Sequence, residues 1–491
     1  MEQFDIVVVG AGASGLSAGL AAAQAGAKVA LLEKGDKFGG AGMFGAQGLF
    51  AVGSKEQEEH GEEYTLKDAF PEVMNYTHHS SNARLTKAIL AKSADTIEWM
   101  RKNGIDTELV TNTQEVHQNH PRTYHQFIDK FNGFKKFMDN FKAAGGTLLT
   151  ETAGNKIIQE NGKVTGIEVI RNGKEEEIAT KAVILADGGF GGNKEEVKQY
   201  LAIDPKDLYS MGERKATGDG LRMLKEVGGV NDYKRIFENH AASVVTGVKN
   251  PWNNGNLMTL ATLPLLWLDQ EGKRFTNEDI VYDFALWGDT TYATGGHYYF
   301  VFDQNFVDYL KNNVLNWTGS FERTGALLAH KDMTYQVGPM KNLQTEIDSL
   351  AGKDPVWKED SLGALAQDIN VPVENLKDSL ERYNKLVAKK EDTDFYKDSK
   401  FMRFPLEKAP FYAVKAVSTT LGTVGGGLVN ENFEALTSDR KVIPGVYAVG
   451  NDASGMFDSS YPTIEGLSNA FAWNSGRIAG EKASQFVKKG N

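Results

Sequence analysis

The first 33 residues place a glycine-rich turn between two short apolar runs. Phe4–Val9 leads directly into Gly10–Gly15, which reads Gly-Ala-Gly-Ala-Ser-Gly, and Gly12–Ala25 is rich in Ala. Short apolar runs bounded by turns are typical of buried strands, and the Ala-rich segment is long enough for a helix. With the second run at Val29–Leu32, the pattern predicts a βαβ unit, and hence a parallel sheet covered by helices.

The spacing of the three glycines matches a dinucleotide-binding turn. Gly10 permits the tight turn, Gly12 lets a pyrophosphate approach the backbone, and Gly15 lets the helix pack closely on the strand. The first helical turn, with Ala13 and Ser14, offers free N–H groups and a partial positive charge to phosphates. We therefore expect a bound dinucleotide at this turn.

Residues that follow the turn extend the prediction and favour FAD over NAD. Glu33 ends the second strand, where a carboxylate can bind a ribose hydroxyl. Three later features favour FAD by their order along the chain, although each alone could be an ordinary loop. They are Glu33-Lys34 with the glycine-rich run Gly39-Gly40-Ala41 to Gly48, then Ala186–Phe190, and Val442–Asn451 with a helix after it. A glycine-rich run of this kind lets the backbone lie against a flat ring system.

Four further segments show a regular pattern. Thr147–Ile170 alternates apolar and polar residues and predicts a β-meander, and Lys181–Ala186 predicts a buried strand. Asn342–Lys400 is charged and helical in pattern, and Ser468–Lys488 predicts a closing helix. A chain of 491 residues is too long for one hydrophobic core and fits two or three domains.

Composition excludes several classes of protein. Hydrophobic residues make up 41% and charged residues 24%, as in ordinary soluble enzymes, and the formal net charge of -11 argues against nucleic-acid or anionic-lipid partners. The absence of cysteine excludes disulfides, iron–sulfur clusters and thiolate metal sites. No apolar run approaches the roughly 20 residues needed to cross a bilayer, and the N-terminus resembles no signal peptide. We expect a cytoplasmic enzyme without a membrane partner.

The order of these motifs resembles one flavoprotein family, that of soluble fumarate reductases, urocanate reductases and 3-ketosteroid dehydrogenases. The likeness covers nearly the whole chain. It is carried by Gly10–Gly15, Glu33-Lys34, Gly39-Gly40, Ala186–Phe190, Thr217–Gly220, Gly272–Glu278, Gly425-Gly426 and Gly445–Asn451. The motifs are specific for the family and not for a substrate.

The resemblance implies an α/β fold in which a discontinuous Rossmann-like FAD-binding domain, residues 1–238 and 422–491, carries an inserted α+β cap, residues 239–421. It implies non-covalent FAD, because Ala41-Gly42-Met43 stands where some relatives have the His that bonds the cofactor. The implied cofactor residues, besides those of the N-terminal motifs, are Gly48, Ala186, Gly188, Asp219, Gly450, Asn451, Gly466, Leu467 and Ser468. Asn451 stands where many members have Glu.

Carried over position by position, the family's dicarboxylate site is mostly missing. The first clamp His falls on His240 and is kept. The proton-relay Glu and Arg fall near Met258 and Ala261, the catalytic Arg on Tyr282, the second clamp His near Gly422, and the clamp Arg near Thr463. Buried carboxylates without cationic partners cost several kcal/mol. The pattern therefore argues against fumarate or succinate.

The replacements resemble the ketosteroid-dehydrogenase arrangement. There, a Tyr at the position of Tyr282 moves a proton, and a Tyr at that of Tyr461 holds the substrate's carbonyl oxygen together with a backbone N–H. This implies hydride transfer at flavin N5 with proton transfer by Tyr282 at the neighbouring carbon. His240 is a candidate helper, because free Tyr has a pKa of about 10. Each of these three residues could instead be a packing residue.

The substrate remains open between classes. The leading expectation is a large apolar ring compound, a steroid or an isoflavonoid, and the chain resembles the tetrahydrodaidzein reductases. Tyr292, Tyr298, Tyr299, Trp252, Trp267 and Trp287 suggest an apolar pocket, or equally the core of the cap. A small unsaturated acid would need a rebuilt clamp with Arg122 or His297, and an electron-transfer subunit would have no use for a cap. The electron donor is NAD(P)H, a flavodoxin or a ferredoxin.

No metal is expected. His117, His120 and His125 lie close together in the sequence, but neither a carboxylate nor a Cys completes a metal-binding set. The loop Pro121–His125 is expected near the flavin instead.

Overall fold

The computed structural model describes residues 2–232, 237–247, 255–317, 319, 336–457 and 464–490. Its largest N-terminal sheet has six strands, and five of them are parallel. In spatial order they are β20 (Glu434–Leu436), β21 (Val442–Ala448), β11 (Ala182–Leu185), β2 (Ile6–Val9), β3 (Val29–Leu32) and β7 (Thr147–Leu149). Only β20 runs antiparallel to its neighbour. The predicted βαβ unit is therefore present and forms the middle of the sheet.

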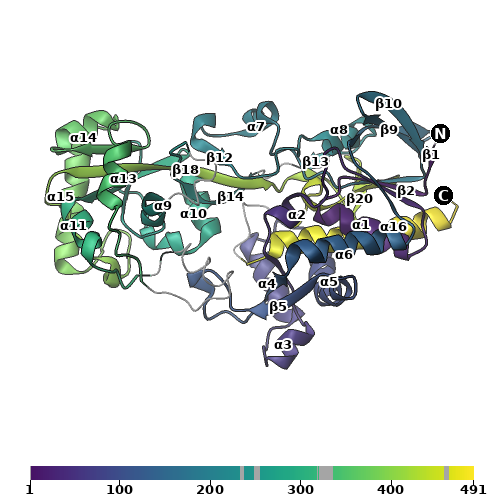
Figure 1. Ribbon diagram of the computed structural model, residues 1–491, viewed down its shortest axis with the longest axis horizontal. Helices are drawn as coiled ribbons and strands as arrows, with labels where there is room; N and C mark the ends of the chain where they lie inside the picture. The colour runs from purple at the N-terminus through teal and green to yellow at the C-terminus, as the bar shows by residue number, and fades with distance from the viewer. Residues whose placement is uncertain are drawn as a thin grey trace.

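Burial explains the composition of these strands. All residues of β2, β3 and β11 are buried, which is why they read as continuous apolar runs rather than alternating ones. Helix α1 (Ala13–Gln24) follows β2 and packs along α16 (Leu467–Lys488), the last helix of the chain. The Ser17 hydroxyl donates to the Trp473 carbonyl oxygen at 2.7 Å between them. The two ends of the chain thus build one layer (Figure 1).

Two smaller sheets flank this layer. One is antiparallel apart from its first strand, and consists of β1 (Glu2–Gln3), β10 (Lys174–Ala179), β9 (Lys163–Arg171) and β8 (Thr152–Glu160). The other consists of β4 (Gly48–Phe50), β6 (Tyr124–Ile128) and β5 (Asp106–Val110). The meander expected at Thr147–Ile170 is thus only partly correct, because β7 joins the large parallel sheet instead.

Helices surround these sheets in the N-terminal part of the chain. They are α2 (Gly40–Phe44), α3 (Lys55–Glu59), α4 (Leu66–Tyr76), α5 (Ala83–Lys102), α6 (Lys130–Ala143), α7 (Lys194–Tyr200) and α8 (Asp219–Glu226). Short 3₁₀ turns lie at η1 (Glu115–His117), η2 (Pro205–Asp207) and η6 (Gly450–Asp452). Phe134 and Phe137 of α6 pack edge-on against Trp473, which joins α6 to α16 in the same core.

A second six-stranded sheet organises the opposite end of the molecule. Its central strand is β18 (Phe411–Thr423), which extends across the molecule in Figure 1. The strands that pair with it directly are β12 (Leu208–Ser210), β14 (Phe237–Ser243), β16 (His297–Asp303) and β17 (Val356–Glu359), and β15 (Leu266–Leu268) pairs with β16. A two-stranded ribbon, β13 (Asn231–Asp232) with β19 (Gly426–Gly427), lies beyond its end.

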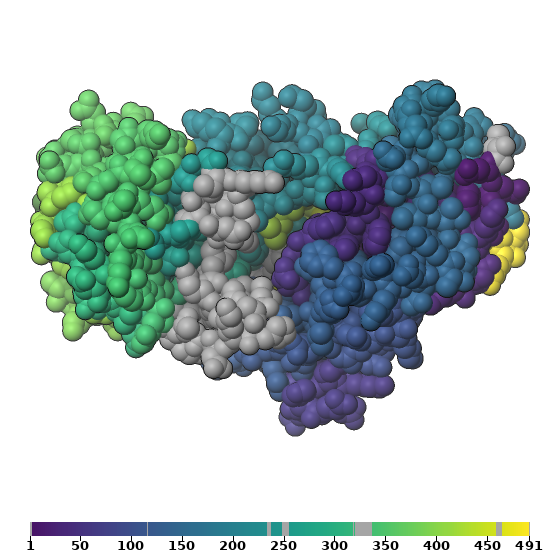
Figure 2. Space-filling view, in the orientation of Figure 1, coloured from purple at the N-terminus to yellow at the C-terminus, as the bar shows by residue number. Residues whose placement is uncertain are grey.

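Helices cover this sheet and form the lobe at the left of Figure 1. They are α9 (Gly255–Ala261), α10 (Phe284–Ala293), α11 (Gln304–Asn312), α13 (Leu343–Leu350), α14 (Leu362–Asp368) and α15 (Val373–Lys389), with 3₁₀ turns η4 (Glu278–Tyr282) and η5 (Ser399–Phe401). The space-filling view shows this lobe and the N-terminal lobe at opposite ends of the long axis (Figure 2). The helical segment expected at Asn342–Lys400 is interrupted by β17. This strand has only four residues, too few for an alternation of apolar and polar side chains to be recognised in the sequence.

The predicted domain boundaries both fall within strands. The one after residue 238 lies in β14 and the one after residue 421 lies in β18, and Phe237 pairs with Thr423. No linker therefore separates the two lobes at these points, and two paired strands cross together from one lobe to the other. The division into domains stays a prediction.

Candidate active site

The glycine-rich turn between β2 and α1 has the geometry that a dinucleotide needs. A Cβ added at Gly10 would lie 2.4 Å from the Ala186 carbonyl oxygen, and one at Gly15 would lie 1.8 Å from that of Gly10. These two positions admit only glycine. A Cβ at Gly12 would meet nothing within 4 Å, so its backbone faces open space where a pyrophosphate can approach. The first turn of α1, with Ala13 and Ser14, follows directly.

Glu33 and Lys34 lie beside this turn. The Glu33 carboxylate accepts from the Ala11 N–H at 3.4 Å and from the Gly35 N–H at 2.7 Å, which places it at the turn; its binding of a ribose stays a prediction. Lys34 Nζ donates to Thr217 at 2.6 Å and to the Asp219 carboxylate at 2.8 Å. Asp219 therefore stands in this cluster through its ion pair with Lys34.

The second glycine-rich run lies against the first. The Gly39 N–H donates to the Ala11 carbonyl oxygen at 2.8 Å, and a Cβ at Gly40 would lie 3.1 Å from the Gly12 Cα. Ala41 follows in α2. Gly48 begins β4, where its carbonyl oxygen accepts from the Asn469 side chain at 2.9 Å. The two runs and the start of α16 are thereby in contact.

A buried pair of carboxylates fixes the turn after β11. Asp452 accepts from the Gly188 N–H at 2.8 Å and the Gly189 N–H at 3.1 Å, while Asp187 accepts from the Gly220 N–H at 3.0 Å. Burial raises the pKa of Asp452 to about 6, and burial together with the Asp452 charge raises the pKa of Asp187. Sequence reasoning missed Asp452, although it directly follows the predicted Asn451.

The C-terminal cofactor residues converge on the same region. A Cβ at Gly450 would lie 2.7 Å from the Ser14 hydroxyl oxygen, which places the end of β21 against the first turn of α1. Gly466 precedes α16 with φ 75°, and a Cβ there would lie 2.6 Å from the Phe50 N. Leu467 and Ser468 then begin α16. Residues from four distant segments therefore meet, and together they fit a dinucleotide with an attached ring system.

Glu238 is a buried carboxyl group at this meeting point that sequence reasoning did not identify. Its Oε1 accepts from the Ser468 hydroxyl at 2.5 Å. Its Oε2 and Asn451 Nδ2 lie 3.5 Å and 3.3 Å from the position of a Cβ added at Gly422. Burial raises the pKa of Glu238 to about 7. The only sequence signal was its place two residues before His240.

Tyr282 closes the 3₁₀ turn η4 in the cap. Its ring stacks on Phe401 with centroids 5.6 Å apart and an interplanar angle of 28°, and only 6% of the residue is exposed. The turn is held by Glu278, whose carboxylate binds the Arg274 guanidinium at 2.8 and 2.6 Å and accepts from the Trp267 N–H at 3.2 Å. A buried ionic network thus positions the chain four residues before Tyr282.

His240 lies in β14 and is buried with its ring edge-on to Phe284 at 5.0 Å. Burial lowers its pKa to about 3, so the imidazole is neutral at physiological pH. A neutral imidazole can hydrogen-bond to a phenol but supplies no positive charge. Tyr461, the third predicted catalytic residue, lies outside the described residues, as does Thr463.

The two positions near which the resemblance places the proton-relay Glu and Arg are apolar packing sites. Met258 and Ala261 lie in α9 and are 2% and 0% exposed within the core of the cap. The two cations that a rebuilt clamp would need have other partners. Arg122 pairs with Glu62, and His297 Nδ1 lies 2.8 Å from an Asp207 carboxylate oxygen.

Four of the cap aromatics belong to its core, which favours the second interpretation of the sequence for them, whereas Tyr292 is half-buried and lies outside the core clusters. Trp267, Trp287 and Tyr298 are fully buried, Trp267 stacks on Tyr298 at 4.2 Å, and Trp287 Nε1 donates to the Tyr298 hydroxyl at 3.0 Å. Tyr299 is 7% exposed and packs against Trp357. Trp252 lies outside the described residues.

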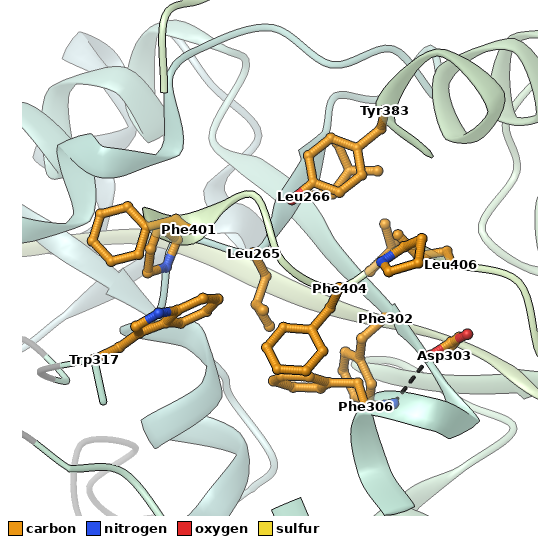
Figure 3. A pocket seen from close by; sticks show the side chains of 13 residues that line it. Leu265, Leu266, Phe302, Asp303, Phe306, Trp317, Tyr383, Phe401, Phe404 and Leu406 are labelled. Atoms are coloured by element: carbon orange, nitrogen blue, oxygen red, sulfur yellow. Dashed lines mark hydrogen bonds between the residues drawn. The ribbon is translucent and has the colours of Figure 1, made fainter. Parts of the chain in front are cut away.

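A small apolar cavity lies near this core (Figure 3). Trp317, Phe401 and Phe404 lie around it, and its volume of about 10 Å³ has room for about one water molecule. Asp303 is the only charged residue in its lining. The Asp303 carboxylate already has a hydrogen-bond partner, because it accepts from the Phe306 N–H at 3.1 Å. A ringed substrate cannot bind there.

One contact ties the cap to the N-terminal lobe near Tyr282. Glu465 is buried and accepts from the Thr113 N–H at 2.6 Å and the Gln114 N–H at 2.7 Å, and Gln114 Oε1 accepts from the Phe284 N–H at 2.7 Å. This chain of bonds holds the start of α10, two residues after Tyr282. It was not predicted, because the three segments are far apart in sequence.

The three neighbouring histidines have separate partners. His117 Nδ1 lies 3.7 Å from Glu465, His120 Nε2 lies 3.2 Å from Glu72, and His125 Nε2 lies 2.8 Å from the Ser54 hydroxyl oxygen. Burial lowers the pKa of His125 to about 4. Among the described residues, no group of three or more His, Asp or Glu side chains could hold a metal ion. Part of the loop Pro121–His125 is in fact strand β6, which pairs with β4 at Gly48.

Comparison with known proteins identifies the architecture. Residues 5–463 match a family described as an FAD binding domain. The chain belongs to this family. It is 31% identical over 504 residues to a protein of Lactiplantibacillus plantarum named vinyl phenol reductase, covering 99% of this chain and 97% of that protein. It is 26% identical to a fumarate reductase (cytochrome) of Shewanella frigidimarina, covering 99% of this chain and 78% of that protein.

Solved structures show the same fold. A 3-ketosteroid delta1-dehydrogenase from Sterolibacterium denitrificans superposes with a TM-score of 0.77 at 18% identity, over 99% of this chain and all of that one. A flavocytochrome c3 fumarate reductase superposes with a TM-score of 0.67 at 24% identity, over 99% and 79%. The family match and the curated relatives show that the chain is an FAD-dependent oxidoreductase acting on CH–CH or C=C bonds, and the solved structures add the likeness of fold. Within the described residues, no helix is long and apolar enough to cross a membrane.

Proposed function

We propose that this enzyme uses non-covalent FAD to reduce a C=C bond conjugated to a phenol or a carbonyl group of an apolar ringed substrate. The observation that carries the proposal is the set of residues at the former dicarboxylate site. Tyr282 stands at the position of a catalytic Arg, and His240 is neutral. A dicarboxylate placed among these residues would lose hydration without gaining a counter-charge, at a cost of several kcal/mol.

The identity of the relatives narrows the choice of ring compound. The L. plantarum protein, 31% identical over nearly the full length of both chains, is named vinyl phenol reductase. Vinyl phenols carry a C=C bond conjugated to a phenol ring and no carboxylate, which suits a site where Tyr282 replaces a catalytic Arg and His240 is neutral. They are therefore the first compounds to test, followed by steroid and isoflavonoid enones.

The reaction adds one hydride and one proton across the C=C bond. When bound and reduced by the electron donor, the flavin would supply the hydride through N5 and return to its oxidised state. Tyr282 would donate the proton to the neighbouring carbon. His240, on the buried strand β14, would hydrogen-bond to the phenol group of Tyr282 without adding charge. Tyr461, with a backbone N–H, would hold the substrate oxygen as negative charge develops on it. The reverse direction, desaturation, uses the same groups.

Reoxidation of the reduced flavin tests the substrate class. The purified enzyme is photoreduced without oxygen and mixed with 4-vinylphenol, a steroid enone, an isoflavonoid enone or fumarate. We expect a ring compound to restore the absorbance of oxidised flavin, and fumarate to leave it reduced, because uncharged residues stand at most of the positions where the family holds two carboxylates. Fast reoxidation by fumarate would show that the substrate assignment is wrong. Release of FAD on denaturation checks the non-covalent attachment.

A small unsaturated acid is the competing substrate class. The relatives named fumarate reductase and urocanate reductase share 26% and 24% identity with this chain. A rebuilt clamp is disfavoured because Arg122 is paired with Glu62 and His297 with Asp207. The electron donor, NAD(P)H or a flavodoxin or ferredoxin, is identified by adding each to the oxidised enzyme and recording flavin bleaching.

A further inference from the structure

Glu238 is a buried carboxyl group that hydrogen-bonds to the proposed cofactor residue Ser468 and has no role in the reaction above. It lies on β14, is 5% exposed, and hydrogen-bonds to Ser468 in the first turn of α16. Gly422 lies on β18 near the side chains of Glu238 and Asn451. A Cβ added at Gly422 would lie 3.5 Å from Glu238 Oε2 and 3.3 Å from Asn451 Nδ2. Three chain segments, β14, β18 and α16, therefore meet at this carboxyl group, beside the proposed cofactor residues Asn451 and Ser468.

No cation faces Glu238 from the described parts of the elements packed on β14. The opposite residues of β18, Thr420–Thr423, and the first turn of α16 are uncharged, as is all of α9. On β14 itself, His240 is neutral. Helix α10 presents only acidic groups, Asp283 at its N-cap and Asp289, which disfavour a second negative charge.

The cations of β18 and α16 lie further along these elements, and two of them have acidic partners. Lys415 of β18 lies 2.6 Å from Asp207, and Arg477 of α16 lies 2.9 Å from Asp95. The hydrogen bond from Ser468 and the N-terminal end of α16 favour the carboxylate, but burial outweighs the hydrogen bond and raises the pKa. A carboxyl group in such surroundings is the kind that keeps its proton near neutral pH and acts as a hydrogen-bond donor.

We propose that Glu238 is protonated in the FAD complex and that its O–H group donates a hydrogen bond to an acceptor atom of the isoalloxazine ring. The ring offers carbonyl oxygens and an unprotonated nitrogen as acceptors, and an ionised Glu238 would instead present a negative charge to them. FAD binding and Glu238 protonation are then linked, so each favours the other. The inference rests on the FAD cofactor and not on the substrate proposed above.

The linkage predicts how FAD affinity depends on pH. The dissociation constant of FAD is measured by titrating the deflavinated protein between pH 6 and pH 8.5, with the fold checked by circular dichroism. Because the pKa of Glu238 is about 7, the constant should be nearly flat at pH 6 and about tenfold higher at pH 8. Glu238→Gln keeps a donor group of the same shape and removes the titration, so its FAD affinity should be flat over the range.

A second variant and a spectroscopic readout keep the test decisive if Glu238→Gln folds poorly. Ser468→Ala removes the hydrogen bond that favours the ionised form, so the rise in the dissociation constant should move to higher pH. Infrared difference spectra of the holoenzyme should show the C=O stretch of a protonated carboxylic acid at pH 8, and Glu238→Gln should lack it. The proposal is overturned if wild type and Glu238→Gln share one pH dependence, or if Ser468→Ala leaves the midpoint unmoved.

Discussion

Tyr282 has a structural role whatever its part in the chemistry, since its ring is packed on Phe401 inside the cap. A substitution there must therefore separate the loss of the hydroxyl from the loss of the ring. Phe keeps the ring and its stacking contact, and removes only the O–H group. Tyr299, in the same lobe, offers a matched control. Its hydroxyl donates to the Ile369 carbonyl oxygen at 3.3 Å, and neither Tyr299 nor Ile369 is a proposed catalytic residue.

Tyr282→Phe should leave FAD binding intact and slow turnover of the active ring compound by roughly 10²-fold, the usual contribution of a positioned proton donor. The Tyr299→Phe control should turn over at close to the wild-type rate. Stopped-flow reoxidation of the reduced flavin measures both rates, and melting temperatures confirm the folds. Near-normal turnover of Tyr282→Phe would remove this residue from catalysis and leave its packing role.

At the scale of elements, the contact between α1 and α16 determines how the two ends of the chain close around the cofactor turn. Small residues let the helices approach closely. A Cβ added at Gly476 would lie 2.1 Å from the Ser14 carbonyl oxygen, and one at Gly480 would lie 2.3 Å from that of Ala18. These contacts are with backbone atoms, which cannot rotate away, so the helices would have to separate.

Gly476→Ala should destabilise the protein by about 1–3 kcal/mol, as overpacked sites do, and weaken FAD binding because Ser14 lies in the cofactor turn. Gly363→Ala is the control. Gly363 lies in α14, and a Cβ there would meet nothing within 4 Å, so the Ala variant should be as stable as wild type or slightly more stable. Melting temperature and FAD dissociation constant are measured for both. Equal behaviour of the two variants would contradict close helix packing as the cause.

At the scale of the whole molecule, buried titratable groups make stability depend on pH. The pKa of Asp452 is raised to about 6, above its usual value near 4, so the folded state holds its proton more tightly than the unfolded state does. This contribution is fully present below pH 4 and is lost as the pH rises through 6. Buried His240 and His125 have lowered pKa values and act in the opposite direction. The net pH profile therefore mixes both effects.

Comparison with Asp452→Asn isolates the acid pair. Asn keeps an acceptor for the Gly188 N–H but does not titrate, so the stability of wild type relative to the variant should fall between pH 4 and pH 6.5. Two pKa units correspond to about 3 kcal/mol, which sets the order of magnitude of the fall. The measurement is the difference in melting temperature at each pH with saturating FAD. A difference that is constant or grows with pH would contradict the assignment.

Much of the fold could be predicted because its signals are local. The strands of the βαβ unit are apolar on both faces, the turn between them carries glycines at positions where a Cβ meets backbone atoms, and the last helix is long and regular. These features depend on residues within about 20 positions of one another. They also determine the cofactor class, because a pyrophosphate binds backbone N–H groups whose geometry the turn itself sets.

The sequence by itself thus determined the βαβ unit and the FAD cofactor, while the residues of the FAD site and the loss of the dicarboxylate cations stay predictions. Only the tertiary structure decided which polar groups lie together. Glu238 meets Ser468 across 230 positions, Glu465 meets Thr113 across 352, and Asp452 meets Gly188 across 264. It also assigned Trp267 and Tyr298 to the cap core. The reason is physical: burial and long-range pairing set the charge of these groups, and neither is encoded in the neighbouring residues.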